Sequence, residues 1–122
     1  MGYDSQNIFA KIIRNEVPCD KVYENDHVLA FRDINPQAPN HVLVIPKGSY
    51  ISMEDFSENG SDLEITEFWR AVGQVARMIG GVSDGYRILA NHGRDAHQEV
   101  FHFHVHIFSG CDLGHMIKIQ NG

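Results

Sequence analysis

The sequence predicts an α+β domain built on an antiparallel sheet of about five strands, with one long and one short helix. Two observations support this class. Apolar residues recur with helical spacing in a short N-terminal segment and in a longer central one. Short apolar or alternating segments bounded by turn residues lie between these two helices and again after the second. An order of helix, strands, helix and strands is typical of an α+β protein rather than of a doubly wound parallel sheet.

The first helix is expected within SQNIFAKIIRNE, near the N-terminus. Four apolar residues share one face of it at helical spacing: Ile8, Phe9, Ile12 and Ile13. We expect Ser5 or Asp4 to cap the helix, because short polar side chains accept hydrogen bonds from the first turn. Pro18 is expected to end it.

The next segments predict three strands. KVYEN and HVLAFRD flank Asn25-Asp26, a turn pair, and are expected to form a hairpin. After the proline-rich turn INPQAPN, the apolar segment HVLVIPK predicts a strand that stops at Pro46, because proline cannot donate to a sheet ladder. We expect KGSYISMEDFSENGS to be a loop with about one helical turn.

The long helix is expected at about residues 61–80, with Ser61 or Asp62 as its cap and Gly80-Gly81 at its end. Its buried stripe is predicted to contain five residues: Leu63, Phe68, Val72, Val75 and Ile79. GYRILAN and EVFHFHVHIFSG predict the last two strands, separated by the polar loop HGRDAHQ.

Length, charge and cysteine usage bound the class of protein. The 122 residues fit one domain, 1–122, and no repeat or linker divides it. A formal net charge of −6 argues against a nucleic-acid partner bound through its phosphates. No segment approaches the ~20 apolar residues of a membrane helix, so we expect no membrane partner. Cys19 and Cys111, far apart, are typical of free thiols in a reducing compartment, which favours a cytoplasmic location.

The segment HFHVHIF, residues 102–108, places His102, His104 and His106 at alternate positions. Successive side chains of a strand point to opposite faces, so the three histidines are expected to share one face. Their apolar neighbours are expected to point into the core: Phe101, Phe103, Val105 and Ile107. Packing explains the apolar residues but not the imidazoles. Three interpretations remain, namely an ordinary solvent-exposed face, a metal site, and catalytic machinery.

Geometry restricts the metal interpretation. Residues two apart on a strand lie ~6.6 Å apart and residues four apart ~13 Å, from a rise of ~3.3 Å per residue. A zinc–nitrogen bond measures only ~2.0–2.1 Å. Two alternate histidines can therefore bind one ion, but three on a regular strand cannot. A zinc site would need two of them and a ligand from elsewhere, such as His41 or Cys111.

The catalytic interpretation is nucleotidyl transfer. A neutral imidazole is a good nucleophile toward phosphorus and also a good leaving group, so one histidine can form a transient covalent adduct. A second can protonate the leaving group, because its unperturbed pKa lies near working pH. A third can orient the first. Such a row of histidines needs no metal ion.

HFHVHIF also fits the His-φ-His-φ-His-φ-φ pattern of the histidine triad (HIT) proteins, where φ is an apolar residue. The segment from NIFAKIIRNE to HVLVIPK resembles the first half of the Hint-like branch, the histidine triad nucleotide-binding proteins. GYRILANHGRDAHQEVFHFHVHIFSG resembles the second half. The resemblance covers about 7–110 and leaves 111–122 as a tail. It implies an α+β fold and a homodimer in which two sheets join into one.

The resemblance further implies binding of purine nucleoside monophosphates or their conjugates. The implied reaction is hydrolysis of nucleoside phosphoramidates or acyl-nucleotides through a nucleotidyl-histidine intermediate, without metal or other cofactor. By motif position, His104 resembles the nucleophile and His106 the group that contacts phosphate and donates a proton. His102 would orient the site, and His41 would complete a relay behind it.

The same resemblance implies a nucleotide-binding set. Asp33 resembles the residue that accepts hydrogen bonds from the ribose hydroxyls, a role for which a carboxylate is suited. Asn91 and Gln98 match positions that hold phosphate oxygens or the leaving group, and Glu99, next to Gln98, belongs to the same expected set with His104 and His106. Five apolar residues match the base pocket, although Phe9, Phe31 and Leu43 would equally serve as core: Ile8, Phe9, Phe31, Ile34 and Leu43.

Two departures from the family pattern bear on the leaving group. Ala96-His97 stands where Gly-Gly often precedes the glutamine, and Glu99 stands where serine is frequent. An ionised carboxylate cannot donate a hydrogen bond as serine would. FSG after the triad, in place of Pro-Arg, argues against the fragile-histidine-triad branch. A dinucleoside polyphosphate hydrolase and a non-catalytic nucleotide-sensing protein are the alternative functions.

Overall fold

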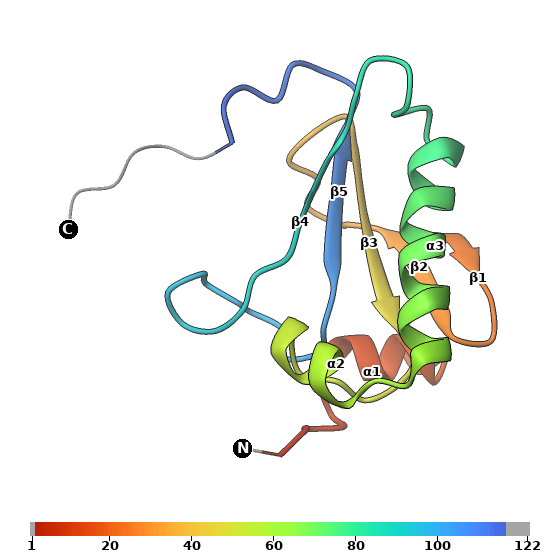
Figure 1. Cartoon of the computed structure of the whole chain (residues 1–122), viewed down its shortest axis with the longest axis vertical. Coiled ribbons are helices and arrows are strands. Elements are labelled where there is room, and N and C mark those ends of the chain that lie inside the picture. The colour runs from red at the N-terminus through yellow and green to blue at the C-terminus, as the bar shows by residue number, and fades with distance from the viewer. Residues whose placement is uncertain (1, 117–122) are drawn as a thin grey trace.

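Eight elements make up the fold in the computed structural model, which describes residues 2–116 (Figure 1). The helices are α1 (Ile8–Ile13), α2 (Met53–Asn59) and α3 (Asp62–Met78). The strands are β1 (Lys21–Glu24), β2 (Val28–Arg32), β3 (Asn40–Pro46), β4 (Arg87–Leu89) and β5 (Val105–Ser109). They form one sheet in the order β1-β2-β3-β5-β4, and every neighbouring pair is antiparallel. The predicted α+β class and five-stranded sheet are confirmed, with α2 as an additional short helix where one helical turn was expected.

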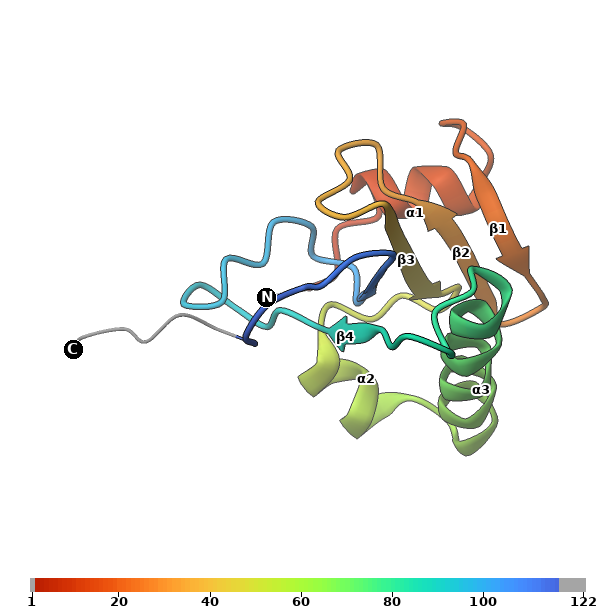
Figure 2. The same cartoon turned by 90° about the horizontal axis from the view of Figure 1, so that it is seen from above.

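The two faces of the sheet are covered unequally. Helices α2 and α3 lie on one face, and α1 lies on the other (Figure 2). The 17 residues of α3 give it a length of about 26 Å, whereas the six residues of α1 span about 9 Å, at ~1.5 Å per residue. Because α1 is so short, it packs on β2 and β3. It leaves open the part of the same sheet face that β3 and β5 form.

Each face has its own apolar cluster, as alternation along the strands requires. The cluster under α3 contains the aromatic residues Phe56, Phe68 and Phe103, with β-branched residues from β2, β3 and β5. The smaller cluster under α1 contains Phe9, Ile12, Leu29, Phe31, Leu43 and Ile45. Neighbours along one strand, such as Leu43 and Val44, therefore belong to different clusters.

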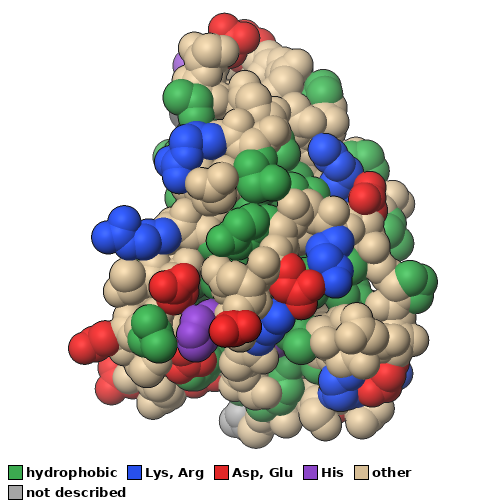
Figure 3. Space-filling view, turned by 90° about the vertical axis from the view of Figure 1, so that its right-hand side faces the viewer, with side chains coloured by type: hydrophobic (Ala, Val, Ile, Leu, Met, Phe, Trp, Pro, Cys, Tyr) green, Lys and Arg blue, Asp and Glu red, His purple; other side chains and the backbone are tan. Residues whose placement is uncertain are grey.

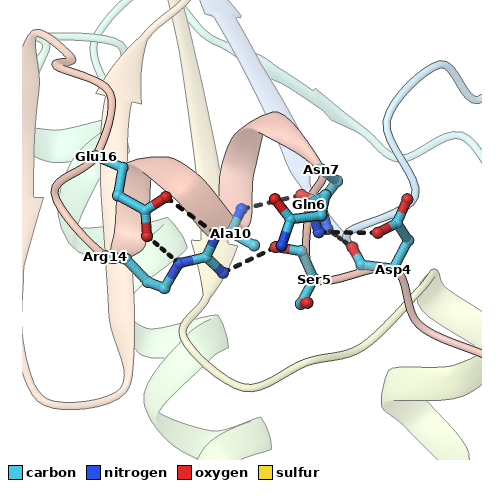
Figure 4. A network of polar contacts seen from close by, with 7 residues as sticks. All are labelled: Asp4, Ser5, Gln6, Asn7, Ala10, Arg14 and Glu16. Carbon is cyan, nitrogen blue, oxygen red and sulfur yellow. Dashed lines mark hydrogen bonds and ion pairs between the residues drawn. The ribbon is translucent and has the colours of Figure 1, made fainter.

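The caps of α1 differ from the prediction. Asn7, not Ser5 or Asp4, caps the helix, and its side chain accepts a hydrogen bond from the Ala10 backbone N–H. Asp4 closes the preceding turn instead, where its carboxylate accepts from the Gln6 N–H. The helix also ends before Pro18, because Asn15 takes a left-handed conformation with φ 62°. Figure 4 shows the polar contacts of Asp4, Gln6, Asn7 and Ala10 at the start of the helix.

The hairpin of β1 and β2 is confirmed at its predicted turn. The Asn25 side chain accepts hydrogen bonds from the backbone N–H groups of His27 and Val28, which holds the two strands at their connection. Strand β3 ends at Pro46, as predicted. On the side of the molecule that carries α3 and β1, acidic and basic side chains are interspersed (Figure 3), so charge of one sign is not gathered there.

Helix α3 begins as predicted, with a capping box. The Ser61 hydroxyl accepts from the Glu64 N–H, and the Glu64 carboxylate accepts from the Ser61 N–H. The predicted buried stripe is right for Phe68, Val72 and Val75. Leu63 was wrongly placed in it and is 56% exposed, because five residues from Phe68 turn it about 140° around the helix.

Strand β5 is shorter than the predicted strand, so that His106 lies within it whereas His102 and His104 precede it. It begins only at Val105, so residues 98–104 follow an irregular path. Phe103, Val105 and Ile107 are buried as predicted, but Phe101 is 52% exposed and not part of the core. Strict alternation cannot extend to Phe101, because the chain has no ladder partner there.

Two further expectations concern cysteines and membrane segments. Cys19 and Cys111 are both free thiols. Among the helices of the described residues, none has the length and apolar character needed to span a bilayer. The tail 111–122 is described only as far as Met116.

Replacing Phe68 with Ala should lower the free energy of unfolding by about 3–5 kcal/mol, because a fully buried aromatic ring leaves a cavity. Leu63→Ala, on the same helix, should change it by less than about 0.5 kcal/mol. Urea-induced unfolding measures both values. Equal losses for the two variants would contradict the orientation of α3.

Candidate active site

The open part of the α1 face holds a cavity of about 240 Å³. Five segments contribute to its lining, namely α1, the loop before β3, β3 itself, the loop before β5, and the triad segment. The lining residues are Phe9, Asp33, Asn35, Gln37, Leu43, Asn91, His97, Glu99, Val100, His104 and His106. Two larger hollows lie elsewhere, and their described lining residues include no histidine. The chemistry-bearing side chains therefore converge on the smaller cavity.

The register of β3 and β5 brings His41 to His106. Leu43 lies opposite His106, and His41 lies opposite Phe108. Residues opposite each other or two apart along a strand share a face, so both imidazoles are on the face that α1 leaves open. The nitrogens His41 Nε2 and His106 Nδ1 are 2.9 Å apart.

Backbone groups determine which nitrogens of this pair carry protons. The Gln37 backbone N–H can only donate, and it lies 3.2 Å from His41 Nδ1. Neutral His41 must then carry its proton on Nε2 and donate it to His106 Nδ1. Neutral His106 is left with a proton on Nε2. Burial, followed by the neighbouring His104 and His41, lowers the pKa of His106 to about 4, so the neutral form holds at neutral pH.

His104 has the opposite tautomer. Its Nδ1 lies 2.8 Å from the backbone carbonyl oxygen of His102, which can only accept, so Nδ1 carries the proton. Nε2 keeps its lone pair. The side chain is only 8% exposed and lines the cavity, and burial lowers its pKa. One cavity thus holds an unprotonated nitrogen of His104 and a protonated nitrogen of His106, with ring centroids 5.1 Å apart.

His102 points to the same side of the sheet as His104, as expected for the row, because both rings pack edge-on against Phe9, with ring centroids 6.4 Å and 5.0 Å away. Unlike His104, His102 does not reach the open part of that face. It is fully buried and outside the cavity lining. Its Nε2 donates to the Pro46 carbonyl oxygen at 2.7 Å, and its Nδ1 lies 2.5 Å from the Tyr3 hydroxyl. Burial lowers the pKa of His102 to about 4. His41, expected to complete a relay behind the site, hydrogen-bonds to His106.

The predicted nucleotide-binding residues divide into two groups. The cavity lining includes Phe9, Asp33, Leu43, Asn91 and Glu99 together with two triad histidines. Outside the lining, Phe31 is buried and packs edge-on against Phe9 with ring centroids 5.5 Å apart. Ile8, at the start of α1, is exposed. Ile34 is 91% exposed because it lies in a tight turn, in which the Asp33 carboxylate accepts from the Asn35 N–H.

The Gln98 amide is fully engaged with backbone groups. Its oxygen accepts from the Gly93 N–H, and its nitrogen donates to the carbonyl oxygens of Ile51 and Val100. Gln98 is buried and outside the cavity lining. These contacts fix the loop of residues 91–98, whose neighbours Asn91 and Glu99 do line the cavity.

Sequence reasoning missed several residues of the site. Asn35, Gln37 and Val100 line the cavity. Asn35 and Val100 are next in sequence to the predicted residues Ile34 and Glu99, whereas Gln37 is three residues from Ile34. The role of Gln37 depends on its backbone N–H, for which its side-chain identity is no signal. His97 also lines the cavity and has a left-handed φ of 57°, at the position noted as a departure from glycine.

Among residues 2–116, the cavity lining carries acidic side chains and no lysine or arginine. Asp33 and Glu99 contribute the carboxylates. Hydrogen-bond donors for an anion must come from imidazole and amide groups. A ligand with one negative charge suits such a site better than a polyanion, because the carboxylates repel each further charge.

Three side chains at or behind the cavity can be considered as metal ligands. The candidate ligand atoms of Asp33, His41 and His106 all lie within 4.8 Å of one another. Asp33 Oδ2 is 3.5 Å from His41 Nε2. Binding an ion between the imidazoles would require breaking the His41–His106 hydrogen bond. Of the two further ligands considered from sequence, His41 is thus in place, whereas Cys111 is exposed beyond β5.

Known proteins resemble this chain over almost its whole length. The family model described as the HIT domain matches residues 14–113. A HIT-like protein of Azospirillum brasilense is 58% identical over 115 residues, 94% of each chain. A purine nucleoside phosphoramidase of Escherichia coli is 41% identical over 112 residues, 92% of this chain and 93% of that protein. A solved HIT family hydrolase of Clostridium thermocellum superposes with a TM-score of 0.86 at 37% identity, covering 94% and 99% of the chains.

Stability should fall as the pH is lowered from about 7 to about 5. An unfolded histidine binds a proton below about pH 6.5, whereas His102 and His106 in the folded chain do so only at about 4. Between these values the unfolded chain binds more protons, so the free energy of unfolding decreases with falling pH, by up to ~1.4 kcal/mol per group and pH unit. Urea titrations across this range provide the measurement. A constant free energy of unfolding would contradict the neutral assignment of both imidazoles.

Proposed function

The chain belongs to the HIT domain family, and from this premise we propose that it is a nucleotide-binding hydrolase of the phosphoramidase type. It cleaves purine nucleoside phosphoramidates or acyl-nucleotides through a nucleotidyl-histidine intermediate. The observation that carries the proposal is the pair of complementary tautomers in one cavity, with a lone pair on His104 Nε2 and a proton on His106 Nε2. Nucleophilic attack and proton donation need this combination.

In the proposed complex, the purine lies against Phe9 and Leu43, the apolar part of the lining. Phe31 supports Phe9 from below, and Ile8 and Ile34 flank lining residues at the rim. The Asp33 carboxylate accepts hydrogen bonds from the ribose hydroxyls. The phosphate then reaches the histidines, with Asn91 beside it. Gln98 acts indirectly, by fixing the loop that carries Asn91 and Glu99.

The chemistry proceeds in two steps. A phosphate in contact with the imidazoles favours uptake of one proton by the His41–His106 pair, because an adjacent anion stabilises the cationic form. His104 Nε2 attacks phosphorus, the phosphorus–nitrogen bond breaks, and the leaving amine takes a proton from His106 Nε2. Water then attacks the nucleotidyl-histidine and returns a proton to His106. Nucleoside monophosphate leaves and His104 is again neutral.

The charge of the lining favours this reaction over the dinucleoside polyphosphate alternative. A polyphosphate leaving group brings several negative charges into a cavity that holds Asp33 and Glu99 and, within the part of the chain that the structure describes, no lysine or arginine. An amine brings none. The two carboxylates therefore repel the polyphosphate leaving group but not the neutral amine of the phosphoramidate. Free thiols at Cys19 and Cys111 fit the proposed cytoplasmic location.

His104→Ala should lower turnover of an adenosine phosphoramidate by at least about 10³-fold, because the nucleophile is lost. Affinity for adenosine monophosphate should change by less than about tenfold, since the base, ribose and His106 contacts remain. His27→Ala, which replaces a histidine at the β1–β2 turn, is the matched control and should retain wild-type turnover. Steady-state kinetics and calorimetric titration give the two measurements.

Undiminished turnover by His104→Ala would exclude the proposed mechanism. Faster turnover of diadenosine triphosphate than of the phosphoramidate would favour the polyphosphate hydrolase. Saturable nucleotide binding without turnover of either substrate would favour a sensing protein. Loss of turnover after chelation, with recovery on adding zinc, would indicate that Asp33, His41 and His106 hold a metal ion.

We further propose a homodimer in which the β4 edges of two copies join their sheets. Strand β4 has β5 as its one neighbour, which leaves its other edge without a ladder partner among the described residues. Large apolar side chains on β4 and directly before it are exposed: Tyr86, Ile88 and Leu89. A second copy would cover them and continue the sheet.

Sedimentation should give about twice the 13.8 kDa of one chain at micromolar concentration. Leu89→Asp should shift the mass toward one chain, because it places a charge in the apolar contact. Val82→Asp, which alters an exposed apolar residue outside the strand, serves as the control. A wild-type mass of one chain would contradict the dimer.

A further inference from the structure

We propose that Tyr3 is a positioning residue of the triad. It fixes the His102 ring and thereby the backbone carbonyl group of His102, which orients His104. This role rests on the proposed function. Tyr3 is outside the cavity lining, so it acts on the reaction through His102 and not by touching substrate. The two residues are 99 positions apart in the chain.

The direction of the hydrogen bond follows from the other side of the ring. The Pro46 carbonyl oxygen can only accept, and it lies 2.7 Å from His102 Nε2, so this nitrogen carries the proton. In the neutral ring, Nδ1 must then accept. Its partner at 2.5 Å is the Tyr3 hydroxyl, which therefore donates. The rings meet edge-on, with centroids 5.6 Å apart. Both nitrogens of a fully buried imidazole are thus satisfied.

His102 links this contact to the nucleophile. Its carbonyl oxygen accepts the Nδ1 proton of His104 at 2.8 Å and so leaves the lone pair on His104 Nε2. His102 precedes β5, which begins at Val105, and has no sheet ladder to hold its backbone. The bond from the Phe103 N–H to the Tyr50 carbonyl oxygen is one restraint on this segment, and the ring of His102 supplies another.

Tyr3 can hold a buried ring only if the segment before α1 is itself held. Figure 4 shows how this is achieved. The Asn7 side chain donates to the Asp4 carbonyl oxygen at 2.7 Å, and the Arg14 guanidinium donates to the Ser5 carbonyl oxygen at 2.8 Å. Arg14 also pairs with Glu16, which fixes the guanidinium. The segment after Tyr3 is therefore anchored to α1 at consecutive residues.

Tyr3→Phe keeps the ring and removes the donor. Loss of one hydrogen bond to a buried acceptor should lower kcat for the phosphoramidate about three- to tenfold, with KM within about twofold of wild type, because substrate contacts are unchanged. Tyr23→Phe is the matched control. It removes the hydroxyl that accepts from the Asn25 side chain on the edge of the sheet, and should leave kcat unchanged.

Imidazole ¹⁵N resonances report on the same contact without turnover. In wild-type protein, His102 should be protonated on Nε2 and unprotonated on Nδ1. In Tyr3→Phe, the Nδ1 resonance should shift and the pKa of His102 should rise from about 4, because a hydrogen bond to the neutral form is lost. A shift of the His104 Nδ1 resonance in the same variant would mark the loss of positioning.

Lower turnover with altered His102 and His104 resonances supports the proposal. Wild-type kcat in Tyr3→Phe overturns it, as does lower kcat with His102 and His104 resonances unchanged. If wild-type protein hydrolyses no phosphoramidate, the proposed function fails. The resonances then decide the role of Tyr3 alone: unchanged His104 resonances overturn it, and shifted ones support it.

Discussion

The pairing of β3 with β5 is the constraint on which the rest of the site depends. Its register sets His41 beside His106 on one face, while Val42, Val44 and Ile107 pack under α3 on the other. Two layers of apolar contacts hold this register, because a shift would expose both clusters. The cavity exists because α1 is too short to cover the whole of its face. The histidines that line the cavity therefore lie on the part of the sheet that α1 does not cover.

Backbone groups, more than side chains, decide what each imidazole can do. The carbonyl oxygen of His102 fixes the tautomer of His104, and the N–H of Gln37 fixes that of His41 and, through it, His106. Burial keeps the pKa of each ring low, so these tautomers are neutral. A site whose described lining contains no lysine or arginine can then present a nucleophile and a proton donor to the same phosphate.

Local patterns in the sequence predicted those parts of the fold that local physics determines. The Asn25 turn, the Ser61 cap and the stop of β3 at Pro46 all depend on residues within a few positions. Alternation correctly placed the triad histidines on one side but failed at Phe101, because it cannot reveal that the chain leaves the sheet before Val105. Family resemblance supplied the candidate roles of the histidines. The Tyr3–His102 contact joins segments far apart in the sequence, and the role of Gln37 depends on its backbone N–H. Neither feature produces a periodic signal in the sequence.

The β3–β5 register also determines where this chain can change in length. One residue gained or lost between 102 and 108 would exchange the faces of β5 and send imidazoles toward Phe56 and Phe68. The turns at 81–86 and 110–114 lie outside the cavity lining and escape this limit. Over evolution the triad segment must diverge by substitution alone, whereas insertions and deletions are free to accumulate in those two turns.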